Sequence, residues 1–201
     1  VGLTMSMTGE LQTGTVNRGL TYTASSKTAA DGWNLIGNPY PSMLDWDLVT
    51  KPSTMDNAIY VYDSKNDRYA SYVGGIGING GVNKVATMQA FFVHAKSVTS
   101  LSFSNNARAV GNNSSYLRQM ENSSEFIAKI ALKTGGFSDE TVVRFKAEAT
   151  ELFDSELDAY KLAGSGKQLF LNTKIGEEKA SINSLPFPSN TKEIPLEISI
   201  D

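Results

Sequence analysis

Short segments of alternating apolar and polar residues run through the first half of the chain. They are rich in aromatic, β-branched and threonine residues, and clusters of Gly, Asn, Asp and Ser separate them, which is the pattern of β-strands joined by turns. The predicted strands are residues 3–7, 20–22, 33–36, 58–62, 69–73, 88–95 and 101–103. Polar residues 63–67 between two of these segments predict a hairpin. Residues 90–95 are apolar at odd and even positions, as in a central strand covered on both faces.

The second half continues the strand pattern with one exception. Strands are predicted at residues 126–132, 141–145, 159–162, 168–171, 179–182 and 193–200. Within residues 147–159 the pattern changes, because Leu157 and Tyr160 follow Leu152 or Phe153 at helical spacing. One short helix is therefore predicted in this part of the chain.

The chain divides at a segment rich in asparagine and serine. Residues 109–124 have the composition of a linker and contain several Asn-x-Ser sequons. We therefore predict an all-β fold of two stacked β-sandwich units, residues 1–108 and residues 125–201, joined by this linker. A single jelly-roll-like sandwich that uses strands from both halves is the alternative.

One motif differs from the simple strand pattern. Residues 32–42 read GWNLIGNPYPS, in which an alternating, strand-like segment leads into a loop with two prolines. Pro39 and Pro41 stop the strand, because neither can donate a hydrogen bond to a neighbouring strand and each restricts the residue before it. Trp33 lies in the strand part of the motif, where we expect a core position.

The motif resembles the GWNLxGNPYPS signature of a β-rich region in large secreted and cell-surface proteins of Bacteroidetes that are exported by type IX secretion. Further segments similar to this group are residues 45–47, 59–63, 88–93, 106–108, 138–145, 153–161 and 181–186. The resemblance covers most of the chain and implies an extracellular or cell-surface location. It brings no catalytic residues. The group's C-terminal sorting domain has no counterpart in this sequence, so the export route is implied for the parent protein alone.

Composition and charge exclude several classes of function. The 201 residues contain no cysteine, which excludes disulfides, thiolate metal sites and cysteine nucleophiles. A net charge of −3 gives no indication of nucleic-acid binding, and no apolar run approaches the ~20 residues of a membrane span. The first residues lack a signal-peptide pattern. With the resemblance, this predicts an internal segment that contacts neighbouring domains of a longer exported protein.

Two patterns that could carry enzyme chemistry do not meet its requirements. Residues 75–80 have the spacing G-x-G-x-x-G, but another predicted strand follows where a dinucleotide site needs a helix, so a hairpin loop is expected. His94 is the only histidine and lies within a predicted strand, and the sequence has no nucleophile-elbow motif. We therefore predict no catalytic residue and no enzyme.

Two acidic segments are candidate calcium sites, because carboxylates at alternate positions are the first ligands of calcium loops. The candidate ligands are Asp154, Glu156 and Asp158 in one segment, and Asp45 and Asp47 in the other. The full EF-hand pattern is not met, since Ala159 stands where the loop needs glycine and Ser165 where it needs glutamate. If the first segment is helical, its aspartates lie one turn apart on a solvated face instead. Calcium is the one cofactor that the sequence suggests.

Aromatic side chains are the stronger candidates for ligand binding, because their rings combine flat apolar area with a hydrogen-bonding edge. The candidate binding residues are Trp46, Tyr60, Tyr62, Tyr69 and Tyr72. Tyr60 and Tyr62 share one strand face, and the acidic neighbours of Trp46 favour its exposure. The alternative is that the tyrosines pack in cross-strand pairs as ordinary strand residues.

These observations predict a non-catalytic binding or adhesion module of a secreted or cell-surface protein. A glycan is the leading ligand, and a surface protein is the other partner considered. Two alternatives remain. The chain could be a structural spacer between neighbouring domains, or an accessory domain of an extracellular polysaccharide hydrolase or peptidase. A glycosidase site needs only two facing carboxylates, which sequence spacing in an all-β fold does not reveal.

Overall fold

The computed structural model describes residues 8–26, 28–109, 125–166 and 169–200, and it confirms the all-β prediction. The strands are β1 (Val16–Leu20), β2 (Trp33–Gly37), β3 (Met43–Asp45), β4 (Ile59–Asp63), β5 (Arg68–Val73), β6 (Ile76–Ile78), β7 (Lys84–Val85), β8 (Ala90–His94), β9 (Thr99–Phe103), β10 (Arg108–Ala109), β11 (Phe126–Thr134), β12 (Phe137–Phe145), β13 (Ala159–Tyr160), β14 (Leu169–Ile175), β15 (Glu178–Leu185) and β16 (Leu196–Ile200). The helical elements of the described residues are the single 3-10 turns η1 (Thr28–Ala30), η2 (Trp46–Leu48) and η3 (Asn105–Ala107). None of these helical turns is long and apolar enough to cross a membrane.

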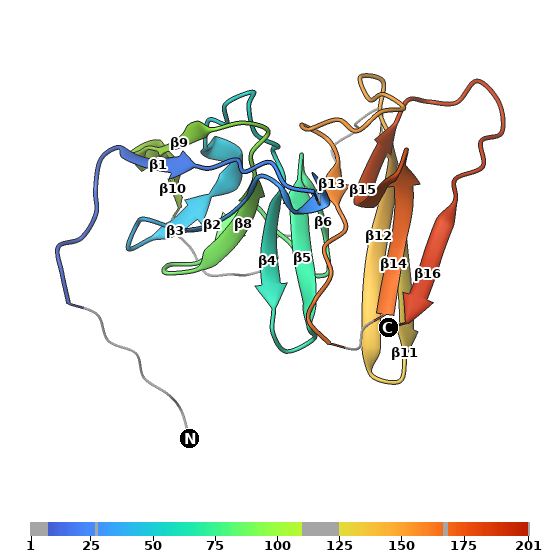
Figure 1. Ribbon diagram of the computed structural model, residues 1–201, viewed down its shortest axis with the longest axis horizontal. Coiled ribbons are helices and arrows are strands. Elements are labelled where there is room, and N and C mark those ends of the chain that lie inside the picture. The colour runs from blue at the N-terminus through green and yellow to red at the C-terminus, as the bar shows by residue number, and fades with distance from the viewer. Residues whose placement is uncertain (1–7, 27, 110–124, 167–168, 201) are drawn as a thin grey trace.

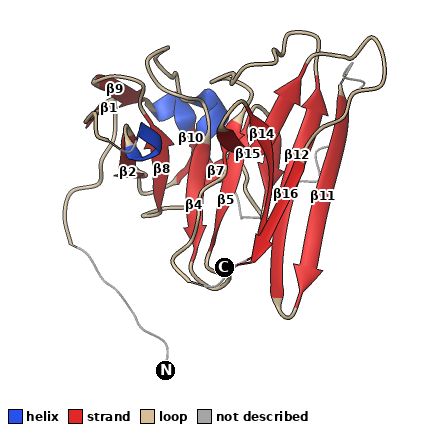
Figure 2. Ribbon diagram, turned by 45° about the vertical axis from the view of Figure 1, so that its right-hand side comes forward, coloured by secondary structure: helices blue, strands red, loops and turns tan. Residues whose placement is uncertain are grey.

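The sheets are stacked in layers (Figure 1). A five-stranded antiparallel sheet, in the order β2-β8-β4-β5-β6, lies in the middle. The pair β1-β9 and the small sheet β10-β3-β7 pack on one side of it, and the six-stranded sheet β11-β12-β15-β14-β16, with β13 paired to β15, packs on the other. Figure 2 shows the helical turns on the side of the smaller sheets, away from β11 and β16.

Both faces of the middle sheet are buried, each in a different core. Ile59 and Tyr72 point into a core shared with the smaller sheets. Tyr60 points the opposite way, into a second core that also contains Val142 and Ile182 of the six-stranded sheet. This alternation follows from the two-residue period of a strand. The second core therefore draws its residues from both of the predicted units, while residues 110–124 of the predicted linker lie outside the described residues.

The helix predicted within residues 147–159 is wrong. Short turns and bends alternate with irregular residues in this segment, and β13 begins at its last residue. The carbonyl of Ser155 accepts a hydrogen bond from the Asn57 backbone N–H at 2.7 Å, so a neighbouring loop uses a carbonyl that a continuing helix would need. Hydrogen bonding to a distant part of the chain therefore outweighs a weak helical pattern in this segment. The strand predicted at residues 3–7 lies outside the described residues.

The GWNLIGNPYPS motif anchors the end of β2. Gly32 has φ +71°, and a Cβ at this position would lie 2.0 Å from the Ala95 carbonyl oxygen, so no other residue fits. Asn38 is buried, and its side-chain amide donates to the carbonyl of Ser42 at 2.8 Å. The Tyr40 hydroxyl donates to the carbonyl of Gly14, which is distant in the sequence, at 2.7 Å. These residues of the motif therefore have structural roles.

Candidate functional site

An aromatic cleft of about 490 Å³ opens between the middle sheet and the second half of the chain. Three rings that contact one another line it: Trp33 at the start of β2, His94 at the end of β8 and Tyr160 in β13. The ring of Tyr22 lines it as well. The charged residues around these rings are Asp31, Lys96, Lys161, Glu177, Glu178 and Lys179. A cleft of this size with a few polar groups around apolar walls has the dimensions of small-ligand sites in proteins.

The three rings hold one another in place. Trp33 and His94 are directly opposite each other in the register of β2 and β8, with ring centroids 5.0 Å apart. Tyr160 contacts both, with centroids 5.9 Å from Trp33 and 5.3 Å from His94, and Phe153 stacks on its ring at 4.2 Å. The Trp33 indole N–H donates to the Ala29 carbonyl at 3.0 Å. The aromatic wall is therefore formed before any ligand arrives.

Asp56 fixes the orientation of the His94 imidazole. Its carboxylate is buried, and its Oδ2 lies 2.6 Å from His94 Nδ1. The Asp56 backbone N–H also donates to the His94 carbonyl at 2.9 Å. This pair places a hydrogen-bonding ring and a buried negative charge beside Trp33 and Tyr160.

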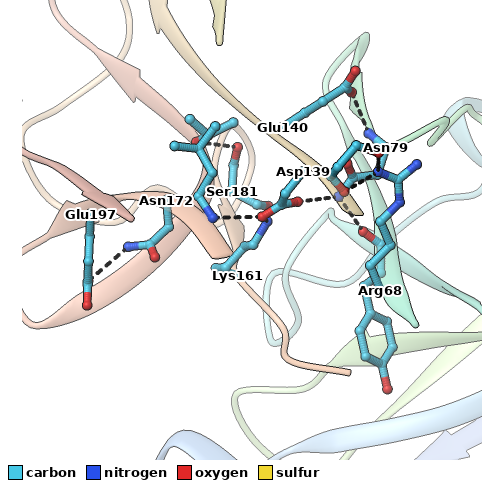
Figure 3. Close-up of polar contacts among 12 residues, drawn as sticks. Arg68, Asn79, Asp139, Glu140, Lys161, Asn172, Ser181 and Glu197 are labelled. Carbon is cyan, nitrogen blue, oxygen red and sulfur yellow. Dashed lines mark hydrogen bonds and ion pairs between the residues drawn. The ribbon is translucent and has the colours of Figure 1, made fainter. Parts of the chain in front are cut away.

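A buried polar cluster ties the two halves together next to the cleft (Figure 3). Its centre is Asp139 of β12, which is 1% exposed. The Asp139 carboxylate forms an ion pair with Lys161 and accepts hydrogen bonds from the Asn79 side chain at 2.8 Å and the Leu171 N–H at 2.7 Å. Burial lowers the pKa of Lys161, and the nearby Asp139 carboxylate opposes this effect. Lys161 also lines the cleft, so this cluster positions one side of it.

Three of the predicted binding aromatics are buried, and none of the three lines the cleft. The prediction that Trp46 is exposed is wrong: the residue is 1% exposed, its ring packs against Phe91, and its indole N–H donates to the Asn57 carbonyl. Tyr60 and Tyr72 are also buried, in opposite cores. For these two tyrosines, the packing alternative describes the structure.

Tyr62 and Tyr69 remain accessible in part. They lie opposite each other across the predicted hairpin, with ring centroids 5.3 Å apart, and Tyr62 is 40% exposed. Tyr69 is half-buried and contacts Phe92. Neither tyrosine lines the cleft.

The acidic candidates for calcium binding form hydrogen bonds and ion pairs within the chain. Asp158 is buried and accepts from the backbone N–H of Ser184 at 2.6 Å and of Asp154 at 2.7 Å. Asp45 forms an ion pair with Lys84, the Asp47 carboxylate accepts from the Tyr72 hydroxyl, and Glu156 donates its backbone N–H to Asp154. Within the described ranges, no group of three His, Cys, Asp or Glu side chains could hold a metal ion.

Comparison with known proteins places the chain in a family. One family model matches residues 2–201, nearly the whole sequence. The chain belongs to this family, described as Domain of unknown function (DUF8693). No curated protein and no solved structure matches the chain.

Sequence reasoning did not identify the cleft of this DUF8693 domain. Trp33 was expected in the core and His94 on a strand face, and both are partly buried at the edge of the cleft. Tyr160 comes from the other half of the chain and reaches these rings only through the packing of β13 against the middle sheet. The sequence indicated only that Trp33 and His94 each lie in a strand with apolar neighbours. Their meeting with Tyr160 depends on tertiary structure.

Proposed function

We propose that this DUF8693 domain is a non-catalytic binding module of a secreted or cell-surface protein, and that it binds a glycan in the aromatic cleft. The observation that carries the proposal is the preformed wall of Trp33, His94 and Tyr160, surrounded by charged side chains. Sugar rings present apolar C–H faces that pack against aromatic rings, and hydroxyl groups that hydrogen-bond to polar groups nearby. The resemblance to exported surface proteins supports a location where glycans are available.

A glycan-array screen of the purified chain tests the proposal, with Trp33→Ala and Leu35→Ala as paired variants. Both residues lie in β2 and point to the same face, but Leu35 is 60% exposed and does not line the cleft. We expect Trp33→Ala to weaken binding at least about tenfold, the loss of about 1.4 kcal/mol or more from one stacking ring. Leu35→Ala should leave binding unchanged. Equal effects of the two variants would contradict the assignment of the cleft.

A structural spacer is the second candidate, favoured by the buried polar cluster around Asp139. A domain that presents its neighbours at a fixed distance needs a stiff internal junction, and this cluster joins β12, β14 and the end of β6 through a buried ion pair and hydrogen bonds. A folded protein that binds nothing across the array would favour the spacer over the binding module.

A further inference from the structure

A largely buried carboxylate lies beside the aromatic wall. Asp31 lines the cleft two residues before Trp33 and is only 5% exposed. Its Oδ2 accepts from the Ser25 backbone N–H at 3.2 Å, whereas its enclosed Oδ1 accepts no hydrogen bond. In the part of the chain that the structure describes, no Lys, Arg or His side chain forms an ion pair with Asp31. A buried carboxylate in this state costs free energy that a nearby positive charge would offset.

The lysines around the cleft already have partners. Lys161 forms the buried ion pair with Asp139, and Lys179 forms an ion pair with Glu197 at 2.9 Å. Lys96 donates to the Ser155 hydroxyl at 3.1 Å. Of the positive charges that line the cleft, Lys96 alone has no carboxylate partner among the described residues.

Among the described residues, the acidic side chains in and behind the cleft outnumber the single lysine that lacks a carboxylate partner. Glu177 and Glu178 are exposed, and neither forms an ion pair with a described residue. Asp56 adds a buried carboxylate behind the imidazole of His94. The pKa of the Tyr160 hydroxyl is raised, mainly by burial and further by the negative charges of Asp56 and Glu178. The unbalanced charge that faces the aromatic rings is therefore negative.

Aromatic faces beside carboxylates favour a positively charged ligand. An ammonium group is attracted to the face of a tryptophan or tyrosine ring, and more strongly where water is excluded. We propose that the cleft selects glycans that carry a free, protonated amino group, which lies beside Asp31 and against the ring of Trp33. This inference rests on the proposed function, because the same cleft has to bind the glycan.

Calorimetric titration with three hexasaccharides tests the inference: one of glucosamine units, one of N-acetylglucosamine units and one of glucose units. The titrations are run at about pH 6, below the ordinary pKa range of amino groups. We expect the glucosamine hexamer to bind the wild-type chain about tenfold more tightly than the N-acetylated one, because acetylation removes the positive charge. A trilysine peptide, which carries amino groups without a sugar ring, should bind more weakly than the glucosamine hexamer.

Asp31→Asn is the decisive variant. The amide keeps the size of the side chain and an oxygen that can accept from Ser25, but it removes the charge. We expect it to weaken glucosamine-hexamer binding about tenfold and to leave N-acetylglucosamine binding within about twofold. The control is Glu193→Gln, which removes an exposed carboxylate that does not line the cleft and should change either affinity less than about twofold.

Each outcome of these titrations distinguishes the inference from the proposed function. Equal binding of the amino and N-acetyl hexamers to the wild type would overturn charge selection and leave glycan binding intact. A preference for the amine that survives Asp31→Asn would overturn the assignment to Asp31. Trilysine binding as tight as that of the glucosamine hexamer would show a general ammonium site and overturn selection of a glycan. A folded chain that binds none of the three hexamers would overturn both proposals.

Discussion

Asp139→Ala should lower the free energy of unfolding by about 3–5 kcal/mol, because it leaves the buried Lys161 ammonium without its partner. Both side chains of this ion pair are at most 5% exposed. The substitution also removes the acceptor for the Leu171 backbone N–H and for the Asn79 side chain. Since Lys161 lines the cleft, we also expect the variant to bind any ligand of the cleft more weakly.

Urea unfolding followed by circular dichroism measures this effect. Glu151→Ala is the matched control, because the exposed side chain of Glu151 forms an ion pair with Lys192 on the surface, and exposed pairs contribute about 0–1 kcal/mol. A loss of less than about 1 kcal/mol for Asp139→Ala would show that the cluster does not hold the two sheets together in solution.

The second large effect is a pH dependence that comes from Asp158. Burial raises the pKa of its carboxyl from the ordinary 3.8 to about 6, although hydrogen bonds from the backbone of Asp154 and Ser184 oppose the shift. Between these pH values the folded chain holds a proton at Asp158 that the unfolded chain has lost. The contribution to stability is therefore fully present below about pH 4 and is lost as the pH rises through about 6, and a shift of two units corresponds to about 3 kcal/mol.

Asp158→Asn isolates this contribution, because an amide does not titrate in this range. Other carboxyls with lowered pKa values, such as Asp63 and Glu140, stabilise the fold as the pH rises, and they are common to both proteins. We expect the free energy of unfolding of the wild type to fall by about 3 kcal/mol relative to the variant between about pH 4 and pH 7. A difference between the two proteins that does not change with pH would contradict the raised pKa of Asp158.

The strand pattern predicted much of the fold because it is a local property. Tyr62 and Tyr69 illustrate this: alternation and the polar turn between them were enough to predict their hairpin, and their register confirms it. The helix within residues 147–159 was wrong because long-range contacts decide that segment. The short strands β3, β6, β7 and β10 were not predicted, since two or three residues carry no measurable periodicity.

The candidate site was harder to predict, because burial of a single side chain depends on which layers cover it. Aspartates on both sides of Trp46 suggested an exposed ring, yet the two carboxylates bind Lys84 and Tyr72 while the ring packs into the core. No motif in the sequence marks Asp31 as a binding residue. Its significance comes from enclosure next to Trp33, in a cleft that both halves of the chain build.

The fluorescence of the two tryptophans offers the most direct measurement of binding in the cleft. Trp33 lines the cleft, whereas Trp46 is buried in the core on the other side of the middle sheet. Trp46→Phe leaves Trp33 as the single indole of the chain, and Trp33→Phe leaves Trp46. Each variant is titrated with the glucosamine hexamer. We predict a saturable change in the emission of Trp33 and none in the emission of Trp46. Calorimetric binding without a change at Trp33, or with a change at Trp46 instead, would contradict a glycan site in this cleft.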